Sequence, residues 1–298
     1  MLPTLRQLQY LKLLAEHRSF SRAAEAAHVT QPTLSAGVQE LERILGAPVV
    51  DRGRAGVILT AAGEEAAARA ETILAQAEDL VQAARGAGQP LAGRFRLGVI
   101  PTIAPFLLPL ALPALRQRYP KLRLFLREDL TGRLVTGLKS GALDAALIAL
   151  PYDTTGLEWA DVEEERLYAA FPANHPLSAE TSVTTERLAD ETLILLEDGH
   201  CLREHALAAC GMADERSRDE AAFAATSLPT LVQMVGSGLG VSFLPAMAVD
   251  AGLAEAAAVT VRPLAAAHAT RQIVVAWRAG SSRAVEGRLL ADVMKTRG

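Results

Sequence analysis

Residues 19–46 read SFSRAAEAAHVTQPTLSAGVQELERILG. This stretch predicts two helices joined by a tight turn at 28–29. The first, over 21–27, takes Ser19 or Ser21 as its N-cap, because a side-chain oxygen there accepts from the free amides of the first turn. Its small alanines allow a neighbouring helix to cross closely. A helix-turn-helix is therefore the first structural prediction.

The second helix of this stretch carries its own start and stop signals. Thr30 or Gln31 caps it, and Pro32 stands in the first turn, where a missing amide hydrogen does no harm. Gly46 ends it. Leucine and valine recur at intervals of four, three and four, which predicts one buried stripe along the helix; the residues are Leu34, Val38, Leu41 and Leu45.

The flanking sequence extends this module to residues 1–60. Leucines at helical spacing over 4–17 predict a preceding helix. After the stretch, 48–60 (PVVDRGRAGVILT) has short β-rich runs on either side of a turn at 53–56, which predicts a hairpin. We expect three helices and a hairpin.

Residues 61–90 are predicted to be a long helix and a hinge. The helix carries apolar residues at alternating steps of four and three, a short heptad seam suited to a close helix pair in a dimer. The alternative is one long helix that packs on its own domain. The Gly-rich residues 86–90 end the pattern and predict the hinge. The seam residues are Ala66, Ala70, Ile73, Ala77, Leu80 and Ala84.

Residues 91–298 alternate strands with helices, which predicts an α/β regulatory domain. Strands over 94–100, 122–128 and 143–150, with helices between them, form a βαβαβ unit and hence a parallel sheet. A second set runs from 167 to about 248, and a late strand over 271–277 precedes a final helix. We expect two lobes with a cleft between them: lobe I over 91–163 and 268–298, and lobe II over 164–267.

Composition sets limits on the class of protein. The net charge is −4, but residues 1–60 carry seven Lys or Arg against five Asp or Glu and are the net-positive part. Nucleic acid would therefore meet the N-terminal module. No stretch resembles a signal peptide or a membrane span, so we expect a cytoplasmic protein with no membrane association. Two cysteines exclude a disulfide framework and are too few for a structural zinc site by themselves.

The two cysteines, Cys201 and Cys210, are nine positions apart. In a continuous helix they would be separated by roughly 13.5 Å along the axis. A disulfide needs Cα atoms within about 4.4–6.8 Å. If the two bond at all, the segment between them must refold. The spacing alone does not decide between such a switch and two buried, inert cysteines.

Local chemistry favours Cys201 as the reactive cysteine of the two. Asp198-Gly199 is typical of a helix entry, which would place Cys201 near the positive end of a helix dipole. His200, Arg203 and His205 are possible cationic neighbours, and Cys210 has an apolar setting.

On the second helix of the opening stretch, polar residues lie away from the apolar stripe. In helix-turn-helix proteins the first residues of that helix reach base edges in the major groove. Arg18, Arg52 and Arg54 are positioned to hold phosphates. The alternative is a three-helix module for protein contacts. The polar residues are Gln31, Thr33, Ser35 and Gln39.

The stretch 19–46 closely resembles the N-terminal domain of LysR-type transcriptional regulators. The resemblance implies a winged helix-turn-helix domain, a long linker helix, and a two-lobed regulatory domain like a periplasmic binding protein. Val50 departs from the family, which has an aromatic residue or leucine there. The resemblance implies double-stranded promoter DNA as partner, contacted by Gln31, Pro32, Thr33, Ser35 and Arg52.

Three further stretches, 99–109 (VIPTIAPFLLP), 199–210 (GHCLREHALAAC) and 225–246, resemble the hydrogen peroxide sensors of this family. The resemblance implies that peroxide oxidises Cys201 to a sulfenic acid, which condenses with Cys210. It also implies a dimer of dimers that activates antioxidant genes through RNA polymerase and is reset by a glutaredoxin or thioredoxin system. No cofactor or metal is implied. The implied peroxide pocket consists of Thr102, Thr131, His200 and Arg271.

Both threonines are predicted at the carboxyl edge of the sheet, where ligands bind, although a helix N-cap is the commoner role for such a hydroxyl. Two alternative functions remain. The chain would be a LysR-type regulator that binds a small metabolite between its lobes, or a thiol peroxidase or reductase. The second is disfavoured by the lack of a Cys-x-x-Cys motif and by the fused DNA-binding module.

Overall fold

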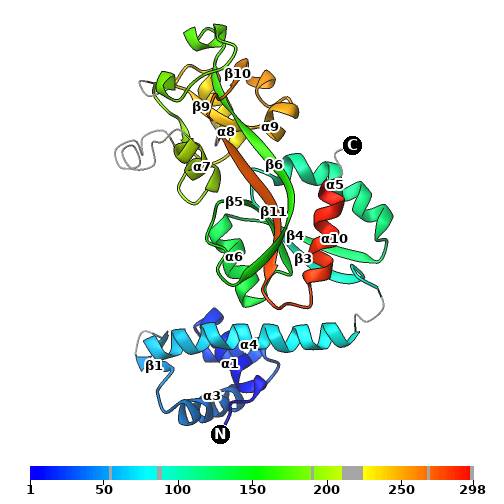
Figure 1. Ribbon diagram of the computed structural model, residues 1–298. Helices are drawn as coiled ribbons and strands as arrows, with labels where there is room; N and C mark the ends of the chain where they lie inside the picture. Colours follow the sequence, from blue (N-terminus) through cyan, green and yellow to red (C-terminus); the bar gives the residue numbers. More distant parts are fainter. Residues whose placement is uncertain (54–55, 86–88, 189–190, 210–223, 267–268, 296–298) are drawn as a thin grey trace. The chain divides into compact units, whose positions relative to one another are not determined.

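The computed structural model describes residues 1–53, 56–85, 89–188, 191–209, 224–266 and 269–295 (Figure 1). Its contacts divide the chain into two compact units. The first comprises residues 1–88 with 139–142, and the second comprises 89–138 and 143–298. No helix in the described ranges is long and apolar enough to cross a bilayer.

Unit 1 begins with the three predicted helices, α1 (Leu5–His17), α2 (Phe20–Ala26) and α3 (Gln31–Leu45). Ser19 caps α2 and Thr30 caps α3, each through its side-chain oxygen. The caps that the sequence left open are thereby assigned. Gly46, in the left-handed conformation with φ 69°, ends α3 as predicted.

The three helices pack around one small apolar core. Leu34, Val38 and Leu41 of α3 are fully buried, as predicted from their spacing. Leu45 is 44% exposed, so its place in the buried stripe was predicted wrongly; it is the last residue of the helix, next to the C-cap Gly46. Gly37 lets α3 approach α1, because a Cβ there would lie 2.6 Å from the ring of Tyr10.

The wing and the linker helix follow. Strands β1 (Val50–Gly53) and β2 (Gly56–Leu59) pair antiparallel, with Gly53 opposite Gly56, and α4 runs over Ala61–Arg85. Part of the predicted dimer seam on α4 is buried within unit 1, and part of it is exposed. Ala70 is fully buried in the core of its own unit, so it is not available to a partner, whereas Ile73 and Leu80 are 42% and 72% exposed. The alternative of packing on its own domain is thus correct for the first half of the seam.

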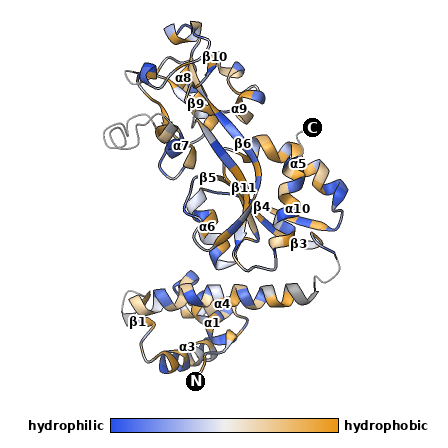
Figure 2. Cartoon of the chain, in the orientation of Figure 1, coloured by the Kyte–Doolittle hydropathy of each residue, from blue (hydrophilic) through white to orange (hydrophobic). Residues whose placement is uncertain are grey.

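Unit 2 is built on a seven-stranded sheet in the order β10-β6-β11-β5-β3-β4, with β9 also paired to β6. Strands β3 (Gly93–Val99), β4 (Leu122–Glu128) and β5 (Ala145–Leu150) are parallel, as the βαβαβ pattern predicts. Helices α5 (Ala104–Arg118), α6 (Thr131–Ser140) and α10 (Ala284–Lys295) accompany them. Figure 2 shows α5 as a largely apolar helix, and Leu107, Ala111 and Leu115 bury its inner face.

Two long antiparallel strands, β6 (Leu157–Pro172) and β11 (Thr270–Arg278), connect the two lobes of unit 2 (Figure 1). From Leu157 to Arg166, β6 pairs with β11; from Leu167 onward it pairs with β9 (Ser242–Pro245) and β10 (Val259–Pro263). The change of partner at 166–167 is where the chain passes from one lobe to the other.

The second lobe holds shorter elements around two apolar clusters. Its helices are α7 (Cys201–Ala209), α8 (Leu228–Gly236) and α9 (Ala246–Asp250), and β7 (Leu195–Leu196) pairs parallel with β8 (Ala224–Ala225). Single 3-10 turns lie at Pro176–Ala179, Glu186–Leu188 and Glu255–Ala257.

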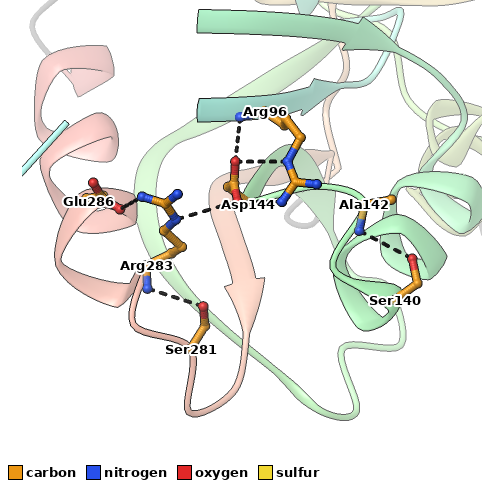
Figure 3. A network of polar contacts seen from close by, with 7 residues as sticks. All are labelled: Arg96, Ser140, Ala142, Asp144, Ser281, Arg283 and Glu286. Carbon is orange, nitrogen blue, oxygen red and sulfur yellow. Dashed lines mark hydrogen bonds and ion pairs between the residues drawn. The ribbon is translucent and has the colours of Figure 1, made fainter. Parts of the chain in front are cut away.

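A polar network fastens the start of unit 2 to its C-terminal helix (Figure 3). The carboxylate of Asp144, 7% exposed, accepts from the backbone and the guanidinium of Arg96 at 2.6–3.2 Å, and Arg283 lies 3.5 Å away. Arg283 also pairs with Glu286 at 2.6 Å, and Glu286 accepts from the amide of Leu91 at 3.0 Å. The residues that follow the predicted hinge are therefore held by ionic contacts rather than by packing alone.

Candidate functional site

The predicted DNA contacts lie on the first turns of α3. Gln31, Pro32 and Thr33 are exposed and Ser35 is half-buried, while Leu34 between them faces the core. This is the arrangement that direct reading of base edges requires: polar groups outward on a helix fixed by its apolar face. Arg52 belongs to β1, but its side chain lies outside the described part of the chain.

Neighbouring side chains hold the exposed end of α3. Thr30 and Thr33 share a hydrogen bond of 2.8 Å between their hydroxyls, and the Thr30 oxygen also accepts from the amide of Thr33 at 3.4 Å. The hydroxyl of Ser21, on α2, donates to Oε1 of Gln31 at 3.1 Å. The predicted reading residues are thus positioned from both helices of the motif.

The second candidate site surrounds Cys201, the first residue of α7, which is 3% exposed. Its thiol is free. Gly199, two residues earlier, has φ 92°, a conformation that glycine adopts without strain. This turn brings the chain from β7 into α7, so the sequence prediction of a helix entry at 198–199 is confirmed.

A buried ion pair lies beside Cys201, at the passage between the lobes. Arg271 on β11 stands opposite Glu165 on β6 in the strand register, and its Nε donates to the Glu165 carboxylate at 2.7 Å. The two side chains are 0% and 2% exposed. The other Glu165 oxygen accepts from the amide of Met247 on α9 at 2.7 Å. A charge buried this deeply needs such partners on every side.

The same guanidinium reaches Thr102, in the turn after β3. Arg271 donates from Nη1 to the hydroxyl of Thr102 at 2.8 Å and from Nη2 to its carbonyl at 3.2 Å. Arg271 therefore joins β6, β11 and the end of β3, and it does so next to Cys201. The side chain that the resemblance placed in the peroxide pocket is thus held by three hydrogen bonds.

Opposing influences act on the Cys201 thiol. Burial raises its pKa; the positive charge of Arg271 and the hydroxyl of Thr131 lower it, and Glu204 raises it. Burial is the largest of these, and the pKa lies above its ordinary value. In this conformation the thiol is therefore protonated at neutral pH, although it sits at the start of a helix.

The other expected cationic neighbours are not among the charges that act on the Cys201 thiol. Burial lowers the pKa of both His200 and His205, so both rings are neutral near pH 7. Arg203 instead donates to the carbonyl of Leu196 at 3.3 Å and pairs with Asp198 at 3.2 Å. Arg271, on a strand distant in sequence, is the cation whose charge acts on Cys201.

Thr131 is the first residue of α6 and is 1% exposed. It is not an N-cap, and neither is Thr102, whose hydroxyl binds Arg271. The Thr131 hydroxyl lies near enough to Cys201 to lower the pKa of the thiol, yet it makes no hydrogen bond of good geometry with any described protein atom. Buried hydroxyls are nearly always paired, so this one is an available donor and acceptor beside Cys201.

His200 and His205 lie on either side of Cys201 in sequence, and both are buried. His205 is one helical turn after Cys201 on α7, and its Nε2 lies 3.0 Å from the carbonyl of Pro151. Its Nδ1 is buried without a partner among the described residues. Tyr152 lies close enough that charge on Cys201 and Glu204 affects its titration: burial and those charges raise its pKa.

Sequence reasoning missed Glu165, His205 as a contact of Pro151, and Tyr152. Glu165 carried a usable signal: it is two residues from Leu167, and strand alternation places both on one face. A carboxylate on a buried face needs a cation there.

Cys210 lies outside the described residues. Within the described ranges, no three His, Cys, Asp or Glu side chains gather in a way that could hold a metal ion.

Comparison with known proteins places this arrangement in a family. Residues 5–64 match the bacterial regulatory helix-turn-helix model of the lysR family, and residues 88–297 match the LysR substrate binding domain. The HTH-type transcriptional regulator EstR of Acinetobacter baylyi is 45% identical over 84% of this chain and 82% of its own length.

Two further relatives cover nearly the whole chain. A probable hydrogen peroxide-inducible genes activator of Streptomyces viridosporus is 38% identical over 98% of this chain and 94% of its own. The structure of a full-length OxyR variant from Pseudomonas aeruginosa aligns with a TM-score of 0.77 at 37% identity, over 99% of this chain and 98% of the other. With a helix-turn-helix at one end and a two-lobed α/β unit at the other, the chain is a DNA-binding transcriptional regulator that belongs to the LysR family.

Proposed function

We propose that the chain is a peroxide-responsive transcriptional activator of the OxyR type, in which Cys201 is the peroxide-reactive thiol. The observation that carries this proposal is the setting of Cys201: a buried thiol beside a fixed Arg271 and an unpaired Thr131 hydroxyl. The identity to a hydrogen peroxide-inducible genes activator over nearly the whole chain supports it.

The chemistry takes two steps. The Cys201 sulfur attacks one peroxide oxygen, the O–O bond breaks, and the second oxygen leaves as water with the thiol proton, so Cys201 becomes a sulfenic acid. The thiol of Cys210 then attacks this sulfur, a second water leaves, and a disulfide forms. A dithiol reductant such as a glutaredoxin or thioredoxin reverses the oxidation.

Four groups would bind peroxide or stabilise the charge that develops. Arg271 would favour the thiolate as the proton leaves. The unpaired Thr131 hydroxyl would bind a peroxide oxygen. Thr102 would hold Arg271 in place, and His200 would close the pocket at the helix entry. Because burial raises the pKa of Cys201, the resting thiol is protected from slow oxidation, and reaction requires a small oxidant that enters the pocket.

Helix α7 makes the second step a conformational switch. Cys201 and Ala209 are its first and last residues, which puts their Cα atoms about 12 Å apart along the axis. Consecutive Cα atoms are separated by about 3.8 Å, so the residue bonded to Ala209 cannot come within disulfide distance of Cys201 while α7 is intact. The disulfide therefore requires α7 to unfold.

Such a switch has an energetic cost that the oxidation has to supply. Unfolding α7 exposes Leu202 and Leu207, now 2% and 5% exposed, at a cost of about 1.5–3 kcal/mol each. Closing a loop of this size restricts the unfolded chain by roughly 2–3 kcal/mol. Both are costs, and the free energy of thiol oxidation supplies them, so the oxidised state is favoured only while oxidant is present.

The remaining partners follow from the same proposal. Promoter DNA would meet the exposed first turns of α3, with Arg52 on a phosphate. The exposed half of α4, with Ile73 and Leu80, would pair with a second copy in a dimer of dimers. The refolded lobe would present a new surface to RNA polymerase in the cytoplasm.

Mass spectrometry of the full-length chain after one equivalent of hydrogen peroxide tests the proposal. We expect a Cys201–Cys210 disulfide within seconds and an altered promoter footprint. Cys201→Ser should abolish both the disulfide and the altered footprint and leave DNA binding intact. Cys210→Ser should leave Cys201 as a sulfenic acid that cannot form the disulfide. Slow oxidation without a change of footprint, or a full transcriptional response in Cys201→Ser, would overturn it.

The same measurements separate the alternatives. A regulator that responds to a small metabolite would keep its footprint under peroxide. A thiol peroxidase would consume many equivalents of peroxide when a reductant is supplied.

A further inference from the structure

The hydrogen bond between Ser21 and Gln31 has a consequence for how DNA is read. Ser19, not Ser21, caps α2, accepting from the amide of Arg22 at 3.5 Å. The hydroxyl of Ser21 is free of that role and donates instead to Oε1 of Gln31, ten residues later and across the turn of the motif. Gln31 is the first residue of α3 and is exposed.

A carboxamide has one acceptor end and one donor end. When glutamine recognises adenine, it uses both at once: its oxygen accepts from N6 and its nitrogen donates to N7. The bond from Ser21 turns Oε1 of Gln31 toward α2. Nε2, on the other branch of the carboxamide, then points away from α2 with both hydrogens available. Gln31 therefore offers DNA a donor rather than a donor–acceptor pair.

We propose that Ser21 is a positioning residue that makes Gln31 read an acceptor edge, guanine or thymine, in preference to adenine. Guanine presents N7 and O6 and thymine presents O4, all acceptors, in the major groove. Adenine presents N7 as an acceptor as well, but beside it the N6 amino group, which would face the Gln31 amino group, and cytosine presents only a donor. This inference rests on the proposed DNA contact of Gln31 and adds the base class that it selects.

The bond is exposed in the free protein, where water competes with it and its contribution to folding is small. At a base edge in the complex, a polar group that loses water without gaining a partner becomes costly. The effect of Ser21 therefore belongs to base preference in the complex, not to the stability of the free chain. This difference can be measured.

The reduced, full-length chain is used to select duplexes from a random double-stranded DNA pool, in parallel with Gln31→Ala. The position at which the two selections differ is the one that Gln31 reads. Affinities are then measured for four duplexes that differ only at that base pair. For the native chain we expect guanine or thymine to bind roughly tenfold more tightly than adenine.

Ser21→Ala frees Oε1, and we expect adenine to rise to within about threefold of the best base, because the carboxamide can then turn to the bidentate geometry. Ser21→Thr keeps a hydroxyl and should restore the native preference. Gln31→Glu replaces the donor by an acceptor and should move the preference toward cytosine, whose N4 donates.

Ser19→Ala is the matched control on the same helix. It removes the α2 cap and should lower the thermal midpoint while leaving the base preference unchanged. Ser21→Ala should do the reverse. An adenine preference in the native chain, or a Ser21→Ala variant that keeps the native preference, would overturn the inference. If Gln31→Ala itself changes no base preference, the proposed role of Gln31 at the DNA fails instead.

Discussion

The two candidate sites are built in opposite ways. On α3, the predicted reading residues fall within five consecutive positions, and they are exposed or half-buried. Around Cys201, the functional groups come from β6, β11, α6, α7 and the turn after β3, and nearly all are buried. A surface that reads DNA has to present polar groups to a partner, whereas a thiol sensor has to exclude everything but a small oxidant.

This contrast determines how each site tolerates change. Groups on α3 are supported by the apolar face below them, so their removal costs binding rather than folding. Groups around Cys201 stabilise one another, because a buried charge or hydroxyl there serves as the hydrogen-bond or ion-pair partner of another, as Arg271 does for Glu165 and Thr102. Substitutions there affect stability and chemistry together, except where a group has no partner in the resting state.

The largest expected effect is at the ion pair. Arg271→Met leaves the Glu165 carboxylate buried without its cation, and we expect a loss of about 3–5 kcal/mol in the free energy of unfolding of unit 2. Urea denaturation measures it. The double variant Arg271→Met with Glu165→Leu should recover much of this loss, since it removes both charges. If Arg271→Met costs less than about 1 kcal/mol, a level typical of exposed pairs, the pair is solvated and the buried site is not built as described.

The two threonines should behave differently. Thr102→Val deprives a buried guanidinium of an acceptor, and we expect a loss of about 1–3 kcal/mol in the free energy of unfolding, measured by urea denaturation.

Thr131→Val removes a hydroxyl that has no good partner, and it should change the free energy of unfolding by less than about 0.5 kcal/mol or raise it. Its effect should appear in the rate of Cys201 oxidation, slowed roughly tenfold by loss of about 1.4 kcal/mol of stabilisation. Stopped-flow thiol titration supplies the rate, and equal rates in Thr131→Val and the native chain would contradict its place in the pocket.

The sequence predicted the first site more completely than the second, for a physical reason. The caps, the turn and the apolar stripe of α3 are local, and the i, i+4 spacing alone places Gln31 and Ser35 on one face of the helix. In the second site, only the helix entry before Cys201 is local. The pairing of Glu165 with Arg271 depends on the register of two strands more than a hundred residues apart, and no spacing encodes that. Burial also keeps His200 and His205 uncharged near pH 7, and the sequence alone does not show that these two side chains are buried.

Burial of His205 makes the stability of the region around Cys201 depend on pH. Burial holds its pKa in the folded chain below the ordinary 6.5, so the unfolded chain binds a proton first. Stability is therefore full above about pH 6.5 and falls as the pH drops below it. His205→Gln keeps a donor for the Pro151 carbonyl and removes the titrating ring, so the fall between about pH 7.5 and 5.5 should be smaller. His200, whose pKa burial also lowers, accounts for part of the remaining fall. An unchanged pH dependence in His205→Gln would mean that this ring does not stay neutral in the folded chain.

The smallest effect on folding is expected at Ser35, and it completes the contrast. Ser35 is half-buried on α3 and lies outside the apolar core of unit 1, so Ser35→Ala should change the free energy of unfolding by less than about 0.5 kcal/mol. Affinity for promoter DNA should nevertheless fall, because a hydroxyl contact to a base or phosphate is lost. Gln39→Ala, one turn farther along the same exposed face, is the matched control and should bind nearly as the native chain does, since the N-terminal residues of the helix enter the groove. A loss of affinity confined to Gln39→Ala would mean that α3 meets DNA by its middle rather than by its first turns. The chain would then share the fold of other helix-turn-helix proteins but not their use of the first residues of the second helix to contact DNA.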